Sequence, residues 1–369
     1  MATIGLDATY LADPQPTGTG EYARQLIKAL ATLETEHHFL LCYRLSRFRR
    51  RREFFCPPPR PAGRGPSFSV RFYQEPFTFW LPWQAKLFHS LAQRPPAFRF
   101  AKEIVTVNDI FPLTGQSYST PQFQRRFADL LRAAVARATY VISPSLYTAD
   151  RLVNHVGVPR GRIRVIQDGV EFPISLLPPE ARRRQREQCA GPGNEMILMV
   201  GVLENRKNVV NALRALPSLP ARYRLVLAGK DGYGHEAIYD FIRQEGLASR
   251  VLVLGYVTKE HLSVLYQAAS VLLFPSLEEG FGIPMLEAMA HGLPVVAAGA
   301  SSLPEVGGEA ALYVDPPDPA DMAAKVRQAT EDTARRAQMI EKGLARARHL
   351  SWRRTAEATL ALYDEVLAQ

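Results

Sequence analysis

The feature that most constrains this chain is a regular alternation of short apolar runs with longer amphipathic stretches. The runs are rich in Val, Ile and Leu and are continuous, which is typical of parallel strands covered on both faces. They predict strands at 4–6, 39–43, 68–72, 104–107, 140–142 and 163–166, and again at 196–200, 225–228, 251–254, 271–274 and 295–297. Two rounds of this alternation predict an α/β protein with two doubly wound domains.

The stretches between the runs predict helices and set the domain limits. Helices are expected at 20–33, 123–138, 145–156, 209–216, 236–245, 259–268 and 284–291, and 320–369 reads as mostly helical. Ser145 suits an N-cap and Gly157 a helix end. The Pro- and Gly-rich segment 173–193 interrupts the alternation. We therefore expect an N-terminal domain over 1–172, a linker region over 173–193, a second domain over 194–350 and a C-terminal helix over 351–369.

Length and cysteine use narrow the class of protein. A chain of 369 residues is too long for one compact core and fits two domains. The three cysteines are odd in number and have no CxxC spacing, so neither a disulfide framework nor a zinc site is expected. No signal peptide and no apolar run long enough to span a bilayer are recognised, so we expect a cytoplasmic protein.

Positive charge gathers in the first half of the chain. Residues 1–170 hold 23 Lys and Arg against 12 Asp and Glu, a balance of +11, whereas the remaining residues hold 22 against 24, a balance of −2. The densest group is Arg47, Arg49, Arg50, Arg51 and Arg52. It suits an anionic membrane surface, although a solvated loop explains it equally well. No nucleic-acid-binding motif accompanies it, so nucleic acid is not expected as a partner.

The segment 44–96 is the least regular part of the chain. It holds Pro57, Pro58 and Pro59 and the aromatic residues Phe77, Phe79, Trp80 and Trp83. A loop that collapses on its own aromatic side chains is the favoured interpretation. A lip for an acceptor or a membrane is the alternative.

The strongest signal for chemistry follows the expected strand at 271–274. Gly280, Phe281, Gly282 and Ile283 open a helix, with Pro284 suited to its first turn. Backbone N–H groups and the positive end of the helix dipole at such a turn attract an anion. Glu279 stands before the turn and Glu287 within the helix, and a carboxylate accepts hydrogen bonds from two adjacent sugar hydroxyls. The pattern predicts a nucleotide-sugar site, against the alternative of a surface Glu pair.

Two further signals follow the first strand of each half. Arg206 and Lys207 come after 196–200, at a strand's carboxyl end, where two cations can neutralise a diphosphate. Gly18 and Gly20 precede the first long helix, but they do not form the GxGxxG fingerprint of NAD-binding proteins. We predict contact with donor phosphates or with the acceptor there, although a simple turn is as good an explanation.

These residues resemble a known family. The stretch from Glu279 to Ala290 is similar to the E-x7-E signature of retaining glycosyltransferase family 4, whose members have the two-Rossmann GT-B fold. The segments 17–22, 166–170, 201–208, 303–306 and 314–316 resemble other conserved stretches of the family, in the same order. The resemblance covers nearly the whole chain except 44–96 and 173–193, and it is closest to mannosyltransferase-like members.

The resemblance implies roles for particular residues. Glu287 is expected to bind the donor ribose, Glu279 and the backbone of Phe281 and Gly282 to face the transferred sugar, and Arg206 and Lys207 to hold the diphosphate. Gly255 and Tyr256 lie in the region that borders the base in similar proteins. The C-terminal helix is expected to cross back onto the N-terminal domain, and the active site to lie in the cleft between the two domains.

Two departures from the family pattern stand out. Asn108 precedes Asp109 where the family often has His, and asparagine cannot act as a general base. Proton removal then falls to Asp109, to His89 or to the donor phosphate itself, the last in a same-face mechanism. The second departure is Asp168, which stands where Asn is usual.

The sequence therefore predicts a retaining, metal-independent hexosyltransferase that needs no cofactor besides its donor. GDP-mannose is favoured as the donor over UDP-glucose or UDP-N-acetylglucosamine, and a saccharide or lipid-linked acceptor is expected. No D-x-D spacing for a divalent metal occurs. Two alternatives stay open at this point: a catalytically silent sugar-nucleotide-binding protein, and an NAD-dependent oxidoreductase with two Rossmann domains.

Overall fold

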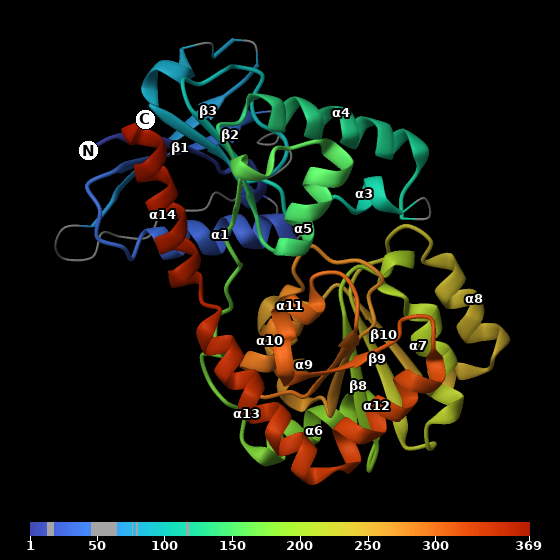
Figure 1. Ribbon diagram of the computed structural model, residues 1–369. Coiled ribbons are helices and arrows are strands. Elements are labelled where there is room, and N and C mark those ends of the chain that lie inside the picture. The colour runs from blue at the N-terminus through green and yellow to red at the C-terminus, as the bar shows by residue number, and fades with distance from the viewer. Residues whose placement is uncertain (13–17, 46–64, 76, 79, 116–117) are drawn as a thin grey trace. The chain divides into compact units, whose positions relative to one another are not determined.

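The computed structural model describes residues 1–12, 18–45, 65–75, 77–78, 80–115 and 118–369. These residues form two compact units (Figure 1). Unit 1 comprises Met1–Thr114, Pro121–Gly169 and Leu350–Gln369, and unit 2 comprises Gly115–Thr120 and Val170–His349. The predicted pair of doubly wound α/β domains is confirmed, although the first unit takes up the end of the chain as well as its beginning.

Unit 1 is built on a parallel sheet with the strand order β3-β2-β1-β4-β5-β6-β7. Every neighbouring pair of strands runs parallel. The strands are β1 Thr3–Asp7, β2 His38–Arg44, β3 Ser67–Tyr73, β4 Leu87–Ser90, β5 Glu103–Thr106, β6 Tyr140–Ser143 and β7 Ile163–Val165.

Helices cover both faces of this sheet, as its continuous apolar strands predict. The helices are α1 Gly18–Leu30, α3 Phe111–Thr114, α4 Pro121–Arg137, α5 Leu146–Arg151 and α14 Trp352–Ala368. One face packs against α1 and α14, with Ile104 and Ile142 between them, and the other packs against α4 and α5, with Val105 and Val141. Helix α14 thus belongs to the core of unit 1, where Tyr363 is fully buried.

Unit 2 repeats the order of the first six of these strands in its own six-stranded sheet, β10-β9-β8-β11-β12-β13, again with parallel neighbours. The strands are β8 Glu195–Val200, β9 Tyr223–Ala228, β10 Val251–Gly255, β11 Val271–Phe274, β12 Val295–Ala298 and β13 Ala311–Val314. Helices lie on both faces of this sheet as well (Figure 1).

The helices of unit 2 fall into two groups. Helices α7 Val209–Ala215, α8 Glu236–Gln244 and α12 Pro319–Glu331 share one apolar core with the sheet. Helices α6 Pro179–Ala190, α9 Lys259–Ala268, α10 Ile283–Ala290, α11 Leu303–Gly307 and α13 Thr333–His349 complete the unit. Among these, α6 packs against α9, and α10 packs against α13.

The structure differs from the sequence-based expectations at three places. The irregular segment 44–96 contains β4, a central strand that pairs with both β1 and β5. Its aromatic side chains divide into two groups: Tyr73 and Phe88 are buried, whereas Phe77 and Trp83 are 68% and 81% exposed, and Phe79 lies outside the described residues. The expected linker 173–193 contains α6, and a further strand, β13, closes the second sheet.

The local signals for helix ends hold. Ser145 caps α5, because its hydroxyl accepts a hydrogen bond from the backbone N–H of Thr148 at 3.0 Å. The π-helical turn Leu152–Val156 follows α5 and ends at Gly157, whose φ of +78° suits a residue without Cβ. Strand β4 escaped prediction because it is only four residues long and half polar, so no periodic pattern marks it.

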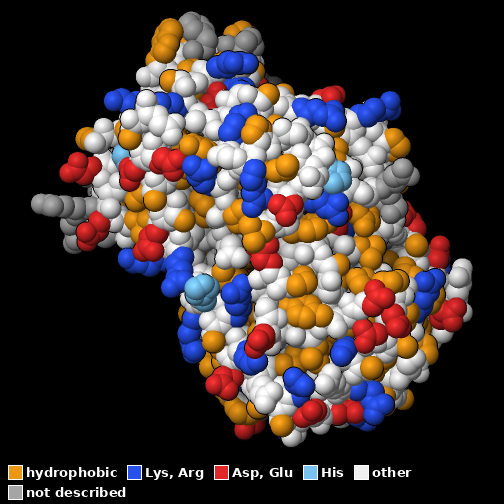
Figure 2. Space-filling model, viewed as in Figure 1, with side chains coloured by type: hydrophobic (Ala, Val, Ile, Leu, Met, Phe, Trp, Pro, Cys, Tyr) orange, Lys and Arg blue, Asp and Glu red, His pale blue; other side chains and the backbone are white. Residues whose placement is uncertain are grey.

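Charge on the surface is mixed where it can be seen. On the face drawn in Figure 2, Lys and Arg side chains are interspersed with Asp and Glu side chains over both units. The arginines from Arg47 to Arg52, proposed as an anionic-surface patch, lie outside the described residues. None of the helices in the described ranges combines the length and the apolar character needed to cross a bilayer.

Candidate active site

The site in unit 2 forms where the order of the strands reverses. The chain passes from β8 to β9 on one side of the sheet and from β11 to β12 on the other. The loops after β8 and β11 therefore meet at the carboxyl edge, which is where doubly wound sheets bind ligands. Residues 201–208 and 275–282 form these two loops.

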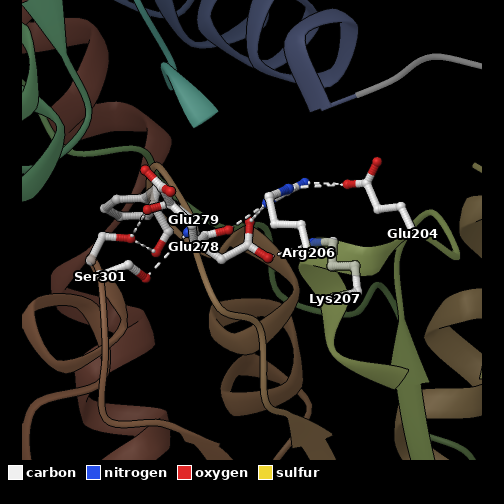
Figure 3. Close-up of polar contacts among 8 residues, drawn as sticks. Glu204, Arg206, Lys207, Glu278, Glu279 and Ser301 are labelled. Atoms are coloured by element: carbon white, nitrogen blue, oxygen red, sulfur yellow. Dashed lines mark hydrogen bonds and ion pairs between the residues drawn. The ribbon is translucent and has the colours of Figure 1, made fainter. Parts of the chain in front are cut away.

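The two loops are joined by ion pairs centred on Glu279 (Figure 3). Arg206 Nη1 lies 2.9 Å from Oε2 of this carboxylate, and Lys207 Nζ lies 2.5 Å from Oε1. All three side chains are buried, with exposures of 8% for Arg206, 9% for Lys207 and 8% for Glu279. The structure thus brings together three of the predicted site residues, from positions more than 70 apart in the chain.

Buried charges of this kind determine the protonation of the site. Burial alone would raise the pKa of Glu279, but Arg206 and Lys207 outweigh it and hold that pKa at about 2. The carboxylate is therefore ionised at neutral pH. Burial lowers the pKa of Lys207, and the adjacent Glu279 opposes that shift. A buried cation is costly unless it is paired, so the ion pairs with Glu279 offset the burial of these two cations.

A second carboxylate, which the sequence analysis missed, orients the guanidinium of Arg206. Glu204 Oε1 accepts from Arg206 Nε at 3.1 Å and from Nη2 at 2.7 Å. The Nη1 group also donates to the backbone carbonyl of Glu278 at 2.6 Å. Two carboxylates and a backbone carbonyl therefore hold Arg206, whereas the ammonium of Lys207 donates to the carboxylate of Glu279. Glu204 gave no signal in the sequence beyond its place in the loop.

The loop after β12 positions the backbone of Glu279 (Figure 3). The N–H of Glu279 donates to Ser301 Oγ at 3.2 Å, and Ser302 Oγ donates to the carbonyls of Glu279 and Phe281 at 2.9 and 3.0 Å. Ser301 has a φ of +56°, which is uncommon outside glycine and indicates local constraint. Neither serine was identified from the sequence.

Asn208 ties three loops of the same edge together. It has a φ of +59°, the left-handed region that Asn tolerates better than most residues. Its Nδ2 donates to the carbonyl of Pro275 at 3.1 Å, after β11, and to that of Pro316 at 2.7 Å, after β13. The charged loop after β8 is therefore fixed by hydrogen bonds to the loops that follow β11 and β13.

The glycine turn leads into α10 as predicted. Gly282 has a φ of +106°, and a Cβ there would lie 2.6 Å from the side chain of Leu303, so only glycine fits without a shift. Helix α10 begins at Ile283, with Pro284 in its first turn. Phe281 is 4% exposed and anchors the turn in the core, while Gly280 precedes it. Helix α10 thus begins four residues after Glu279 of the ion-paired cluster.

Glu287 follows one turn into α10, on an otherwise apolar stretch. The side chain is half-buried, and its Oε2 accepts a hydrogen bond from Tyr266 Oη at 2.9 Å. Tyr266 belongs to α9 and was also missed by the sequence analysis. A carboxylate in this setting needs such a partner to offset its desolvation.

Comparison with known proteins decides the family. Residues 181–346 match the family described as "Glycosyl transferases group 1", and residues 16–172 match "Glycosyltransferase Family 4". These two matches cover one unit each in large part. The chain belongs to the family 4 glycosyltransferases of the GT-B type. The oxidoreductase alternative is thereby overturned, and the chain is an enzyme that transfers a sugar.

Relatives and solved structures agree with this membership. The glycosyltransferase is 28% identical over 275 residues to O-antigen chain mannosyltransferase B of Escherichia coli, an alignment that covers 72% of this chain and 71% of the relative. It is 29% identical over 276 residues to the serotype-specific mannosyltransferase WbdA of the same species, covering 72% of this chain but only 34% of that protein. The chain therefore spans about a third of the length of this second relative.

The fold matches solved protein structures over nearly the whole chain. Sucrose-phosphate synthase from Thermosynechococcus elongatus superposes with a TM-score of 0.75 at 22% identity, covering 100% of both chains. Anabaena HepE, solved with UDP and glucose, gives a TM-score of 0.74 at 19% identity, covering 99% of this chain and 100% of that one. At such identities the likeness establishes the GT-B fold of the glycosyltransferase.

The remaining predicted glycines and Tyr256 lie on other elements of the glycosyltransferase. Gly255 ends β10 with a φ of +68°, and Tyr256 beside it is 42% exposed. Gly18 and Gly20 lie in the first turn of α1, in unit 1. None of these four contacts the ion-paired cluster through a hydrogen bond that the described residues show, so their assignment to the site stays a prediction.

Asn108 and Asp109 follow β5 at the carboxyl edge of unit 1. Both polar side-chain atoms of Asn108 are buried and have no hydrogen-bond partner among the described residues. A buried amide without a hydrogen-bond partner destabilises the folded state. Such unpaired groups often occur at positions that bind a ligand. The two residues belong to unit 1, whereas the ion-paired cluster belongs to unit 2.

His89 is excluded as the base that removes a proton from the acceptor. It is fully buried in unit 1, with Nδ1 at 2.6 Å from Tyr363 Oη and Nε2 at 2.8 Å from Thr106 Oγ1. Burial lowers its pKa to about 3, so the ring is neutral and both nitrogens are occupied. The tyrosine comes from α14, so His89 ties the C-terminal helix to the sheet.

Asp168, the second departure from the family pattern, is buried near the end of the second segment of unit 1, Pro121–Gly169. It is 3% exposed, and its Oδ1 has no hydrogen-bond partner among the described residues. Burial raises its pKa to about 7. An Asn at this position would carry no charge to bury. Across the described ranges, no three His, Cys, Asp or Glu side chains gather as metal ligands do.

Proposed function

We propose that this glycosyltransferase moves a hexose from a nucleotide-diphosphate sugar to a saccharide or lipid-linked acceptor, with retention of configuration and without a metal ion. The observation that carries the proposal is the buried pair Arg206 and Lys207, held by Glu279 at the switch point of unit 2. Two fixed cations at such an edge suit a diphosphate, because its negative charge grows as the glycosidic bond breaks.

The other groups of unit 2 supply the rest of a donor site. The N-terminal turn of α10, which starts at Ile283, offers backbone N–H groups to the phosphates. In this proposal Glu287, eight residues after Glu279, accepts hydrogen bonds from the ribose diol. In this proposal Gly280 and Gly282 let the backbone approach the donor, and Gly255 and Tyr256 border the base.

A same-face transfer fits the lack of an imidazole beside Asp109. The bond between the sugar's anomeric carbon and the donor phosphate oxygen breaks, and a bond from the acceptor oxygen forms on the same face. The proton of the acceptor hydroxyl moves to an oxygen of the departing diphosphate. Asn108, with its amide atoms unpaired, hydrogen-bonds the sugar or the acceptor and does not take up this proton.

GDP-mannose is the favoured donor, followed by UDP-glucose and UDP-N-acetylglucosamine. Support for mannose comes from the names of the E. coli relatives, which are mannosyltransferases. Support for UDP donors comes from HepE, whose structures contain UDP and UDP-glucose. The acceptor class rests on the first of these relatives, which is named for an O-antigen chain, and on the basic first half of the sequence. Binding of that half to an anionic membrane stays part of the proposal.

The test identifies the anomeric configuration of the sugar in the first product, either transferred or hydrolysed. The protein is incubated with GDP-mannose, UDP-glucose and UDP-N-acetylglucosamine in turn, with EDTA and with oligosaccharide acceptors, and the first product is read by proton NMR. We expect one donor to be used, EDTA to have no effect, and transfer or slow hydrolysis to give the α-anomer first. A β-anomer as the first product, or complete loss with EDTA, would contradict the proposal.

A further inference from the structure

A tyrosine outside the family motif holds the carboxylate that the proposed function assigns to the donor ribose. Tyr266 lies on α9 and Glu287 on α10, and the Tyr266 hydroxyl donates to Glu287 Oε2 at 2.9 Å. The tyrosine is 2% exposed, so its ring is fixed by packing. Burial raises the pKa of Tyr266 well above its usual value, and the neighbouring Glu287 adds to this effect. The hydroxyl therefore keeps its proton and acts as a donor.

The packing of α9 against α10 fixes this tyrosine from a second side. The ring of His291, at the end of α10, lies 5.1 Å from that of Tyr266 between centroids. His291 Nδ1 is 2.7 Å from the carbonyl of Glu287, and its Nε2 is 2.8 Å from Ser263 Oγ on α9. Both the backbone and the side chain of Glu287 are thus tied to α9 by separate contacts.

We propose that Tyr266 is a positioning residue, which sets the Glu287 carboxylate in the orientation that accepts hydrogen bonds from the ribose diol. The inference rests on the proposed function of Glu287. A carboxylate has about four lone-pair sites, and the tyrosine hydroxyl uses one of them. A glutamate on an exposed helix samples several rotamers, whereas this one has its side chain held before the nucleotide arrives. Binding the diol then requires little further ordering.

The experiment separates ribose recognition from folding. Tyr266→Phe removes only the hydroxyl, and Tyr223→Phe is the matched control. Tyr223 is also a fully buried tyrosine of unit 2, but its hydroxyl contacts Thr330 and Glu331 of helix α12 and not Glu287. Thermal unfolding is recorded for both variants. Dissociation constants for GDP and UDP and for their 2′-deoxy forms are then measured by calorimetry on the full-length protein.

We expect the wild-type protein to prefer the ribonucleotide, and Tyr266→Phe to weaken its binding about tenfold while leaving the 2′-deoxy form unchanged. Tyr223→Phe is expected to change neither constant. If the wild type prefers the ribonucleotide and Tyr266→Phe keeps that preference, Tyr266 has no positioning role. Equal loss for both forms would show a general structural defect and overturn the proposal as well.

Failure of the proposed function gives a different result in the same experiment. A wild-type protein that binds both forms equally removes Glu287 from the ribose, and the role of Tyr266 with it. A wild-type protein that binds none of the nucleoside diphosphates contradicts the donor site itself. A further check is the double variant Tyr266→Phe with Glu287→Gln, whose loss should be no larger than that of Glu287→Gln alone.

Discussion

The two sheets share the order of their first six strands, but burial acts differently on the titratable side chains of the two units. In unit 2, the buried carboxyl group of Glu279 has a pKa of about 2, because Arg206 and Lys207 favour its charged form over the effect of burial. In unit 1, burial raises the pKa of Asp7 and brings that of Asp168 to about 7, and it lowers that of His89 to about 3. All three of these shifts favour the neutral form.

This contrast shows how one topology serves two kinds of ligand. A charged, internally paired edge can exchange its own carboxylate contacts for those of a diphosphate. The unpaired amide of Asn108, after β5 in unit 1, suits hydroxyl groups of a sugar or an acceptor. The strand order places loops at the edge in both units, and the residue types in these loops decide what the edge binds.

Removal of a cation from the charged edge should have the largest effect. Lys207→Ala is expected to lower kcat/KM by about a hundredfold to a thousandfold, since a donor to a developing charge in a dry site contributes about 3 kcal/mol. Steady-state kinetics with the preferred donor measures this. Lys259→Ala is the control, because Lys259 forms an exposed ion pair with Glu171 and should leave the rate near normal. A near-normal rate for Lys207→Ala would show that Arg206 and α10 suffice.

Removal of the central carboxylate should act on stability. Glu279→Gln leaves Arg206 and Lys207 without their shared carboxylate and is expected to destabilise the protein by about 3 kcal/mol at pH 7. Because the folded-state pKa is depressed, the stabilisation is present above the unfolded value near 4.5 and is lost as the pH falls towards 2. Urea unfolding at several pH values should show the variant and the wild type converging below pH 4.5. A constant difference down to pH 2 would contradict the low pKa.

Replacing the buried carboxyl group of Asp168 in unit 1 should change stability in the opposite direction. Asp168→Asn is expected to stabilise the protein by about 4 kcal/mol at pH 8, because the folded-state pKa of about 7 lies about three units above the unfolded value. A raised pKa means that stability is lost as the pH rises from about 4 through 7, and the variant lacks this loss. Unfolding measured at pH 4 and pH 8 gives the two values. Equal stability of both proteins at pH 8 would show that the charge of Asp168 is compensated.

The smallest effect is expected at Asn108. Asn108→Ala should lower kcat/KM about tenfold through loss of hydrogen bonds to the sugar or the acceptor. Nucleoside diphosphate binding should not change, because Asn108 belongs to unit 1. Kinetics and calorimetry on the same variant separate these two readouts. Weaker nucleotide binding would indicate that this amide contacts the donor diphosphate. It would contradict the assignment of the diphosphate to unit 2 alone.

Much of the fold follows from the sequence, because both sheets are buried on both faces. Their strands are continuous apolar runs, and the helices carry recognisable ends such as Ser145 and Gly157. The strand β4 was missed because its polar residues His89 and Ser90 are satisfied inside the core, which no local pattern reveals. Helix α6 is not predicted because prolines, such as Pro178 and Pro179 at its start, are also typical of linkers.

The candidate site was predicted in part for a similar reason. Glu279, Glu287, Arg206 and Lys207 stand in motifs with fixed spacing next to strand ends, so sequence alone marks them. Glu204, Ser301, Ser302 and Tyr266 support them from other loops or another helix, and only the folded chain brings these partners together. The supporting contacts depend on tertiary packing and leave no pattern in the sequence.

The central claim is that the charged edge of unit 2 binds the diphosphate of a nucleotide sugar. The most direct measurement is calorimetric titration of GDP, UDP, ADP and NAD into the wild-type protein and into Lys207→Ala, each with EDTA present. We predict that one of GDP and UDP binds selectively to the wild type, and that Lys207→Ala binds it at least tenfold more weakly. Binding of NAD alone, or the same affinity for the diphosphate in both proteins, would contradict the claim.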